Sequence, residues 1–71
     1  MKVFRITPTE QYSGGAAYVA ANDVEEAIKI FRENDHRDYE YEYGDCICEH
    51  VVNMSYNTDK PFVIFDDLWL D

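Results

Sequence analysis

Basic residues are scarce in this chain, and they are scarcest in its second half. Against 15 Asp and Glu, the 71 residues carry six Lys and Arg, which gives a formal charge of −9 at pH 7. Residues 33–71 hold eleven of the acids and two bases, whereas residues 1–32 hold four of each. The acidic half would repel nucleic acid and anionic membranes, so we expect neither as a direct partner and favour a basic protein surface. The alternative is that the charge serves only solubility.

Long apolar runs are also missing. No stretch approaches the roughly 20 residues that cross a bilayer, and the N-terminus at Met1–Arg5 has no apolar core of a signal peptide. We therefore expect a cytoplasmic protein, in the host cytoplasm if a phage encodes it. An apolar fraction of 46% predicts one small folded domain over residues 1–71. A monomer is favoured.

Cysteine and histidine are few, with two of each. Cys46-x-Cys48-x-His50 has ligand-like spacing, but strand neighbours of this kind lie about 6.6 Å apart and diverge, and only distant His36 could complete a four-ligand zinc site. We expect two small buried thiols rather than a metal site or a disulfide. A small metal-binding or redox protein is the alternative interpretation of this segment.

Catalytic signatures are absent as well. Ser13 has no positioned base in its local sequence, and Gly14-Gly15 precedes a strand and lacks a following Lys, so it indicates a turn rather than a phosphate loop. Acidic pairs such as Asp66-Asp67 are frequent because acids are frequent. We therefore expect no cofactor, no metal and no enzymatic activity.

Four segments favour strands and one favours a helix. Strands are predicted at 3–7, 16–20, 46–52 and 62–65, and the last, continuously apolar, is expected to be well buried. Pro8 is expected to end the first strand, and residues 9–15 and 55–61 are expected to form loops. The tail is expected to dock Leu68, Trp69 or Leu70 on the body.

The helix is predicted at residues 23–34. The run Asn22-Asp23-Val24-Glu25 gives an N-cap residue with Glu25 three positions later, and the acids of the first turn suit the positive end of the helix. The apolar stripe consists of Val24, Ala27, Ile28 and Phe31, with Ile30 at its edge. The order β, β, α, β, β predicts a two-layer α+β domain, with one antiparallel or mixed sheet and a single helix packed on one of its faces.

Residues 38–45 read Asp-Tyr-Glu-Tyr-Glu-Tyr-Gly-Asp. If this run is extended, tyrosines line one face and carboxylates the other, with about 6.6 Å between successive carboxylates. Nucleic acids also carry regularly spaced negative charges. Gly44 marks a bulge or a turn. We call these residues the acidic ladder.

The acidic ladder is the main candidate for function. Like charges at this density destabilise a fold by repulsion, which suggests a purpose such as mimicry of nucleic acid. The candidate partner-binding residues are Asp35, Asp38, Glu40, Glu42, Asp45 and Glu49. Tyr39, Tyr41 and Tyr43 are expected to support them as packing residues.

The unit Ala17–Ala27, in which a strand runs through Ala-Asn-Asp into a helix that contains Glu-Glu-Ala, resembles the middle of many small phage and mobile-element proteins. Some of those are anti-CRISPR proteins. With its size and acidic second half, the chain resembles the DNA-mimicking inhibitors of that group. The resemblance implies a non-enzymatic inhibitor that occupies the DNA-binding surface of a nucleic-acid-binding complex, such as a CRISPR effector subunit.

The second hypothesis is a small accessory or assembly protein. A sheet with one helix leaves one face uncovered, and aromatic side chains there favour an interface with another subunit or another copy. Tyr39, Tyr41, Tyr43 and Trp69 are the candidates for that interface.

Overall fold

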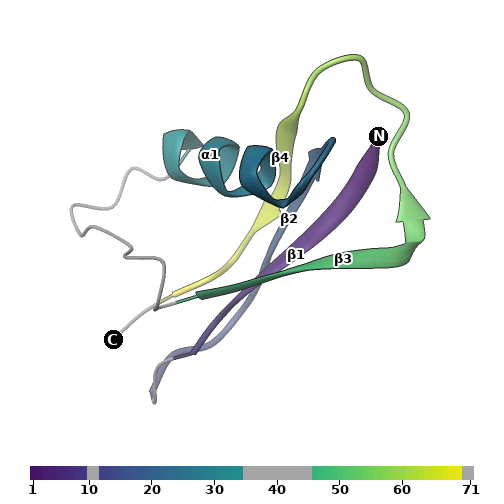
Figure 1. Ribbon diagram of the computed structural model, residues 1–71. Helices are drawn as coiled ribbons and strands as arrows, with labels where there is room; N and C mark the ends of the chain where they lie inside the picture. Colours follow the sequence, from purple (N-terminus) through teal and green to yellow (C-terminus); the bar gives the residue numbers. More distant parts are fainter. Residues whose placement is uncertain (10–11, 35–45, 70–71) are drawn as a thin grey trace.

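A computed structural model of the chain describes residues 1–9, 12–34 and 46–69. They form β1 (Lys2–Pro8), β2 (Ala17–Ala21), α1 (Val24–Asn34), β3 (Cys46–Ser55) and β4 (Phe62–Asp66). The helix lies over one face of the sheet (Figure 1). The predicted two-layer α+β architecture with ββαββ order is confirmed.

The sheet is antiparallel, with the strand order β3-β1-β2-β4. Phe4 of β1 lies opposite Val19 of β2 on one side and opposite His50 of β3 on the other. Tyr18 of β2 lies opposite Phe65 of β4. Paired residues share a face and successive residues alternate between faces. The registers therefore divide the side chains between a helix-covered face and an open face, which no described helix covers.

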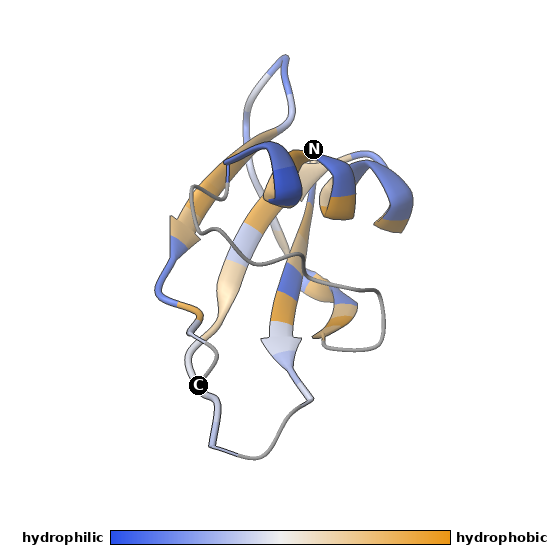
Figure 2. Ribbon diagram, turned by 90° about the vertical axis from the view of Figure 1, so that its left-hand side faces the viewer, coloured by the Kyte–Doolittle hydropathy of each residue, from blue (hydrophilic) through white to orange (hydrophobic). Residues whose placement is uncertain are grey.

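The main core lies between α1 and the sheet. Phe4 and Ile6 of β1 and Val19 of β2 are buried against Ala27 and Phe31 of α1. Polar and apolar stretches alternate along α1, as expected of a helix with one side on the core and one in solvent (Figure 2).

The helix begins at Val24, one residue later than predicted, and Asp23 caps it together with Glu26, in place of the predicted Asn22 with Glu25. Asp23 Oδ1 accepts a hydrogen bond from the Glu26 N–H at 2.8 Å, and Glu26 Oε1 in turn accepts one from the Asn22 N–H at 2.9 Å. These reciprocal bonds satisfy backbone donors at the helix start. The apolar stripe is correct for Ala27 and Phe31, but Val24 is 41% exposed, because it opens the helix at the end of that stripe.

The prediction that Phe62–Phe65 is well buried is wrong. All four side chains keep some exposure, and Phe65 is 54% exposed. The reason is that β4 is an edge strand of a sheet with one helix-covered face. Likewise Cys46 and Cys48, predicted to be buried, are only half-buried, since β3 is the other edge.

Several strand ends also differ from the prediction. β1 includes Pro8, which lies opposite Cys46, and β3 continues to Ser55, into the segment expected to be a loop. Beyond β3, the Met1 ammonium donates a hydrogen bond to the Tyr56 carbonyl at 2.8 Å and thereby ties the start of β1 to the end of β3. The tail does dock, through Leu68, which is 1% exposed.

Candidate protein-binding face

The acidic ladder lies outside the described residues. Residues 35–45 contain Asp35, Asp38, Glu40, Glu42 and Asp45, the supporting Tyr39, Tyr41 and Tyr43, and Gly44. The predictions that these carboxylates bind a partner and that the tyrosines support them therefore stay predictions. Glu49 is the predicted site residue that the structure describes.

Glu49 projects from β3 onto the open face and pairs with Arg5 of β1. The distance from Arg5 Nη2 to Glu49 Oε2 is 3.3 Å, and both side chains are exposed. The two residues lie opposite each other in the register although 44 positions separate them in sequence. An exposed pair of this kind contributes at most about 1 kcal/mol to stability. Glu49 thus has a local partner and is a weaker candidate for binding than its place beside the acidic ladder suggests.

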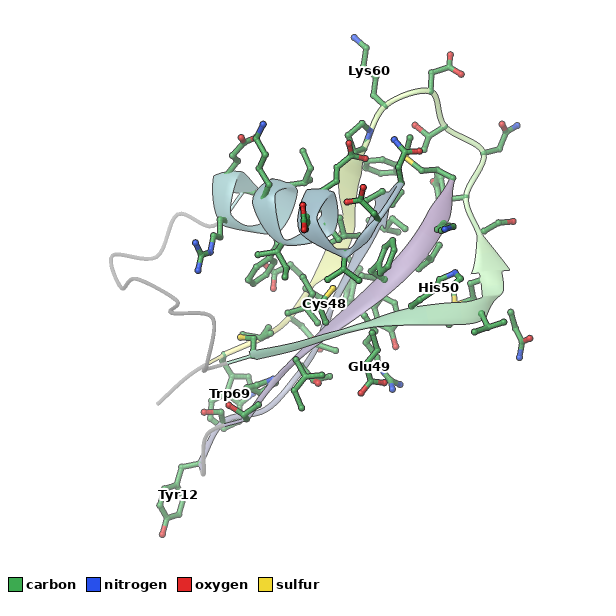
Figure 3. All side chains as sticks on the ribbon, viewed as in Figure 1. Tyr12, Cys48, Glu49, His50, Lys60 and Trp69 are labelled. Atoms are coloured by element: carbon green, nitrogen blue, oxygen red, sulfur yellow. The ribbon has the colours of Figure 1, made fainter. Side chains whose placement is uncertain are left out.

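The open face carries a row of side chains across all four strands. The register aligns Glu49, Arg5, Tyr18 and Phe65 in the order β3, β1, β2, β4. Figure 3 shows Glu49 and Cys48 on opposite sides of β3, with Cys48 on the side of the helix. An ion pair at one edge and an aromatic ring at the other therefore share one surface.

The chain after β4 continues this face. Trp69 forms a bridge with Gly14, and the Asp67 N–H donates a hydrogen bond to the Ala16 carbonyl at 3.1 Å. Both contacts continue the pairing in which Phe65 lies opposite Tyr18 and Asp66 lies opposite Ala17. Phe65 and Trp69 consequently lie on the open face, and Asp67 lies between them with its carboxylate turned toward the Ala16 N–H.

Three large apolar side chains at the end of the open face that carries Trp69 are about half exposed. Ile47 is 47%, Phe65 54% and Trp69 50% exposed. Trp69 lies at the same end of the molecule as Tyr12, which is also exposed (Figure 3). We call Ile47, Phe65 and Trp69 the exposed apolar set. Ile47 lies on the β3 edge of this face, and Phe65 and Trp69 lie on the β4 side, with β1 and β2 between them. Large apolar side chains exposed on one face are a typical feature of protein interfaces.

The other end of the open face is closed. Val3 and Ala20 lie opposite each other there and are fully buried. Phe62 lies opposite Ala20, and its ring packs edge-on against Tyr56 with 5.1 Å between the ring centroids. This small second core limits the accessible part of the open face to the end with Phe65 and Trp69.

The cysteines and His50 project to the helix-covered side. His50 packs against Phe4 with ring centroids 5.4 Å apart. Burial, followed by the charge of Glu49, raises the pKa of the Cys48 thiol from 9.0 to about 11, so this thiol is protonated at neutral pH and a poor nucleophile. Within residues 1–9, 12–34 and 46–69, no three His, Cys, Asp or Glu side chains converge as metal ligands do.

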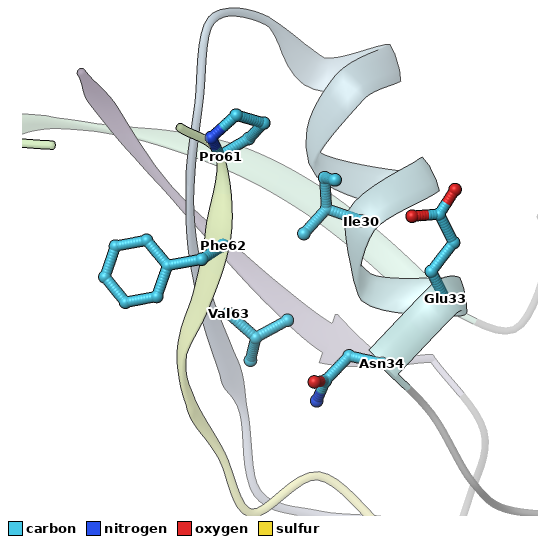
Figure 4. A pocket seen from close by; sticks show the side chains of 6 residues that line it. All are labelled: Ile30, Glu33, Asn34, Pro61, Phe62 and Val63. Carbon is cyan, nitrogen blue, oxygen red and sulfur yellow. The ribbon is translucent and has the colours of Figure 1, made fainter. Parts of the chain in front are cut away.

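A shallow groove of about 260 Å³ separates α1 from β4. Ile30 and Val63 point into it and Phe62 points away from it (Figure 4). Glu33, Asn34 and Pro61 complete the lining. The groove is smaller than the roughly 300–1,000 Å³ of typical small-molecule sites, so it offers little room for a substrate or cofactor.

Comparison with known proteins finds no matching family model, no similar curated protein and no similar solved structure. In the part of the chain that the structure describes, no helix has the length and apolarity required to cross a membrane.

Sequence reasoning missed most of the exposed end of the open face. It included Trp69 among the interface candidates but not Phe65, Asp67 or Ile47. A signal was present, because Phe65, Asp67 and Trp69 alternate with the period of a strand. The sequence does not reveal that β4 is an edge strand, and that position is what leaves Phe65 exposed.

Proposed function

We propose that this protein is a non-enzymatic inhibitor that mimics nucleic acid and occupies the nucleic-acid-binding surface of a basic protein. A CRISPR effector subunit is one such partner, in line with the resemblance to anti-CRISPR proteins. The observation that carries the proposal is the segregation of charge, with eleven acids against two bases in residues 33–71. In the fold, this half supplies both edge strands, whereas the balanced half supplies the central strands and all but the last two residues of the helix.

The physical basis is competition for the same cationic groups. Arginine pairs with carboxylates in the bidentate geometry that it also uses for phosphates. The ladder residues Asp38, Glu40, Glu42 and Asp45, with Asp35 nearby, act as phosphate substitutes in this proposal. Lysines and arginines that bind this protein are then no longer available to nucleic acid.

The test is capture from a bacterial lysate on the immobilised protein, with and without excess duplex DNA. We expect capture of a nucleic-acid-binding protein, loss of that capture when DNA is added, and loss with the double variant Glu40→Lys/Glu42→Lys. Capture that persists in the presence of DNA, or in the double variant, would contradict mimicry.

A matched control is the double variant Glu25→Lys/Asp59→Lys. It changes the net charge by the same amount, at two exposed positions outside the acidic ladder. Because net charge alone would affect both double variants equally, mimicry requires that the control keeps most of the captured protein.

The second candidate function is that of a small accessory or assembly protein that binds through the open face. The exposed apolar set favours it, since each of its three members leaves about half of its surface in solvent. An interface of this kind depends on apolar burial rather than on charge.

Salt distinguishes the two candidates. Binding by mimicry weakens steeply as the salt concentration rises, whereas binding through the exposed apolar set is nearly indifferent to salt. For the second candidate, Phe65→Ser should abolish salt-resistant binding. Val52→Ser is the control, because Val52 is 79% exposed but does not belong to that set.

A further inference from the structure

Trp69 is the only tryptophan of the chain, and it is fixed in place while half of it is exposed. The Gly14 N–H donates to the Trp69 carbonyl at 3.2 Å, and the Trp69 N–H donates to the Gly14 carbonyl at 3.0 Å. The preceding residue, Leu68, is buried in the core. The Trp69 backbone is therefore held by two hydrogen bonds to Gly14 and by the buried side chain of Leu68 before it.

Gly14 makes room for the indole. A Cβ atom at position 14 would lie 2.9 Å from Cζ2 and 3.1 Å from Nε1 of Trp69, so any larger residue would push the ring away. The indole therefore packs close to the Gly14 backbone, which restricts its movement on that side. An exposed aromatic side chain that is already ordered loses little entropy on binding, and tryptophans of this kind are typical anchors of protein interfaces.

Asp67 places a negative charge next to this ring. It is exposed and lies two residues before Trp69, just beyond the end of β4. Its Oδ1 accepts a hydrogen bond from the Ala16 N–H at 2.8 Å, which orients the carboxylate and leaves Oδ2 for another donor. No described Lys or Arg forms an ion pair with it, whereas Glu49 on the open face is paired with Arg5.

We propose that Trp69 and Asp67 form a docking site for an arginine side chain of a protein partner. The guanidinium lies on the exposed part of the indole and donates hydrogen bonds to the Asp67 carboxylate. Charge complementarity identifies the occupant, because the ring stands beside an unpaired carboxylate in a chain of net charge −9. The inference rests on the proposed function in one respect, namely that the partner is basic.

Arginine fits this site better than lysine does. The guanidinium is planar and weakly hydrated, so it stacks on an aromatic ring and pairs with a carboxylate at once, whereas an ammonium group keeps its hydration. A nucleic-acid base also stacks on indole rings, but its phosphates would be repelled by Asp67 and by the net charge.

The experiment uses Trp69 as its own reporter. Hexa-arginine and hexa-lysine peptides, which carry equal charge, are titrated against the whole protein at physiological salt while tryptophan fluorescence is recorded. We expect a saturable change with hexa-arginine and a Kd at least about threefold lower than for hexa-lysine. Equal Kd values for the two peptides would overturn the inference.

Two variants and one control variant locate the effect. Asp67→Asn keeps the Oδ1 acceptor and removes the charge, and it should weaken hexa-arginine binding by about threefold. Asp59→Asn, at an exposed loop position, makes the same change of net charge and should have a smaller effect. Gly14→Ala should reduce the preference for arginine because it displaces the indole, with circular dichroism confirming the fold. Identical behaviour of the Asp67 and Asp59 variants would contradict the site.

The ladder variant Glu40→Lys/Glu42→Lys separates this inference from the proposed function. Its net charge lowers the affinity for both peptides, but the ratio of their Kd values should stay as in the wild type if the site is at Trp69. Capture that persists in the presence of DNA or in the ladder variant, with a lower Kd for hexa-arginine than for hexa-lysine, refutes mimicry alone. Equal affinity of the wild type for both peptides, with DNA-sensitive capture intact, refutes the arginine site alone.

Discussion

At the scale of single residues, two glycines allow residues 67–69 to lie close to the start of β2. Gly15 has a φ of +76°, and a Cβ atom there would collide with the Asp67 carbonyl oxygen. A side chain at position 15 would meet rigid backbone, whereas one at position 14 would meet the movable indole of Trp69. The sequence Gly14-Gly15 thus permits the close approach of the tail to the start of β2, a role beyond the turn that the sequence predicts.

Folding changes the titration of Cys48. Burial raises the pKa of its thiol to about 11, so the folded protein holds this proton more tightly than the unfolded chain does. The contribution of Cys48 to the free energy of unfolding is therefore complete below about pH 9 and is lost as the pH rises towards 11.

This shift predicts slow alkylation. In a Cys46→Ala variant, iodoacetamide at mildly alkaline pH should modify Cys48 at least about tenfold more slowly in the folded protein than in urea, because the thiolate is the reacting species. Mass spectrometry of the quenched reaction measures both rates. Equal rates in the folded and unfolded states would show that the thiol is not protected.

At the scale of elements, the start of α1 offers the clearest test of the fold. Asp23→Ala removes the acceptor for the Glu26 N–H and should lower the free energy of unfolding by about 1 kcal/mol. Urea denaturation followed by circular dichroism measures the change. Glu25→Ala is the control, since Glu25 is exposed in the same turn, and it should cost much less than Asp23→Ala.

The helix and the strands could be predicted because their signals are local. The helix cap lies within one residue of the predicted position, and Ala27 and Phe31 share a helical face, so residues close in the sequence contain the information. The pairing of Arg5 with Glu49 and the approach of Trp69 to Gly14 depend instead on register between distant strands. Strand order also decided which of the apolar residues in β4 would be buried, and no local pattern encodes it.

At the scale of the whole molecule, net charge and stability are coupled. A charge of −9 on 71 residues produces repulsion that a compact fold feels more than an extended chain does. The ion pair between Arg5 and Glu49 offsets this repulsion only weakly, because both side chains are exposed.

Salt should therefore stabilise the protein. We expect the urea midpoint to rise when sodium chloride is increased from about 0.01 M, where charges interact over roughly 30 Å, to 1 M, where that range falls to about 3 Å. Lys60→Glu, which adds charge at an exposed loop, should enlarge the increase. A midpoint that does not respond to salt in either protein would show that repulsion is not a significant cost.

The strand order has a consequence for self-association. Both edges of the sheet, β3 and β4, come from the half of the chain that holds all of the excess negative charge. Edge strands offer backbone groups to any neighbouring molecule and are the usual starting points of aggregation. Two copies that approached edge to edge would bring their acidic halves together. The repulsion between acidic halves thus opposes the growth of this small sheet into a larger one.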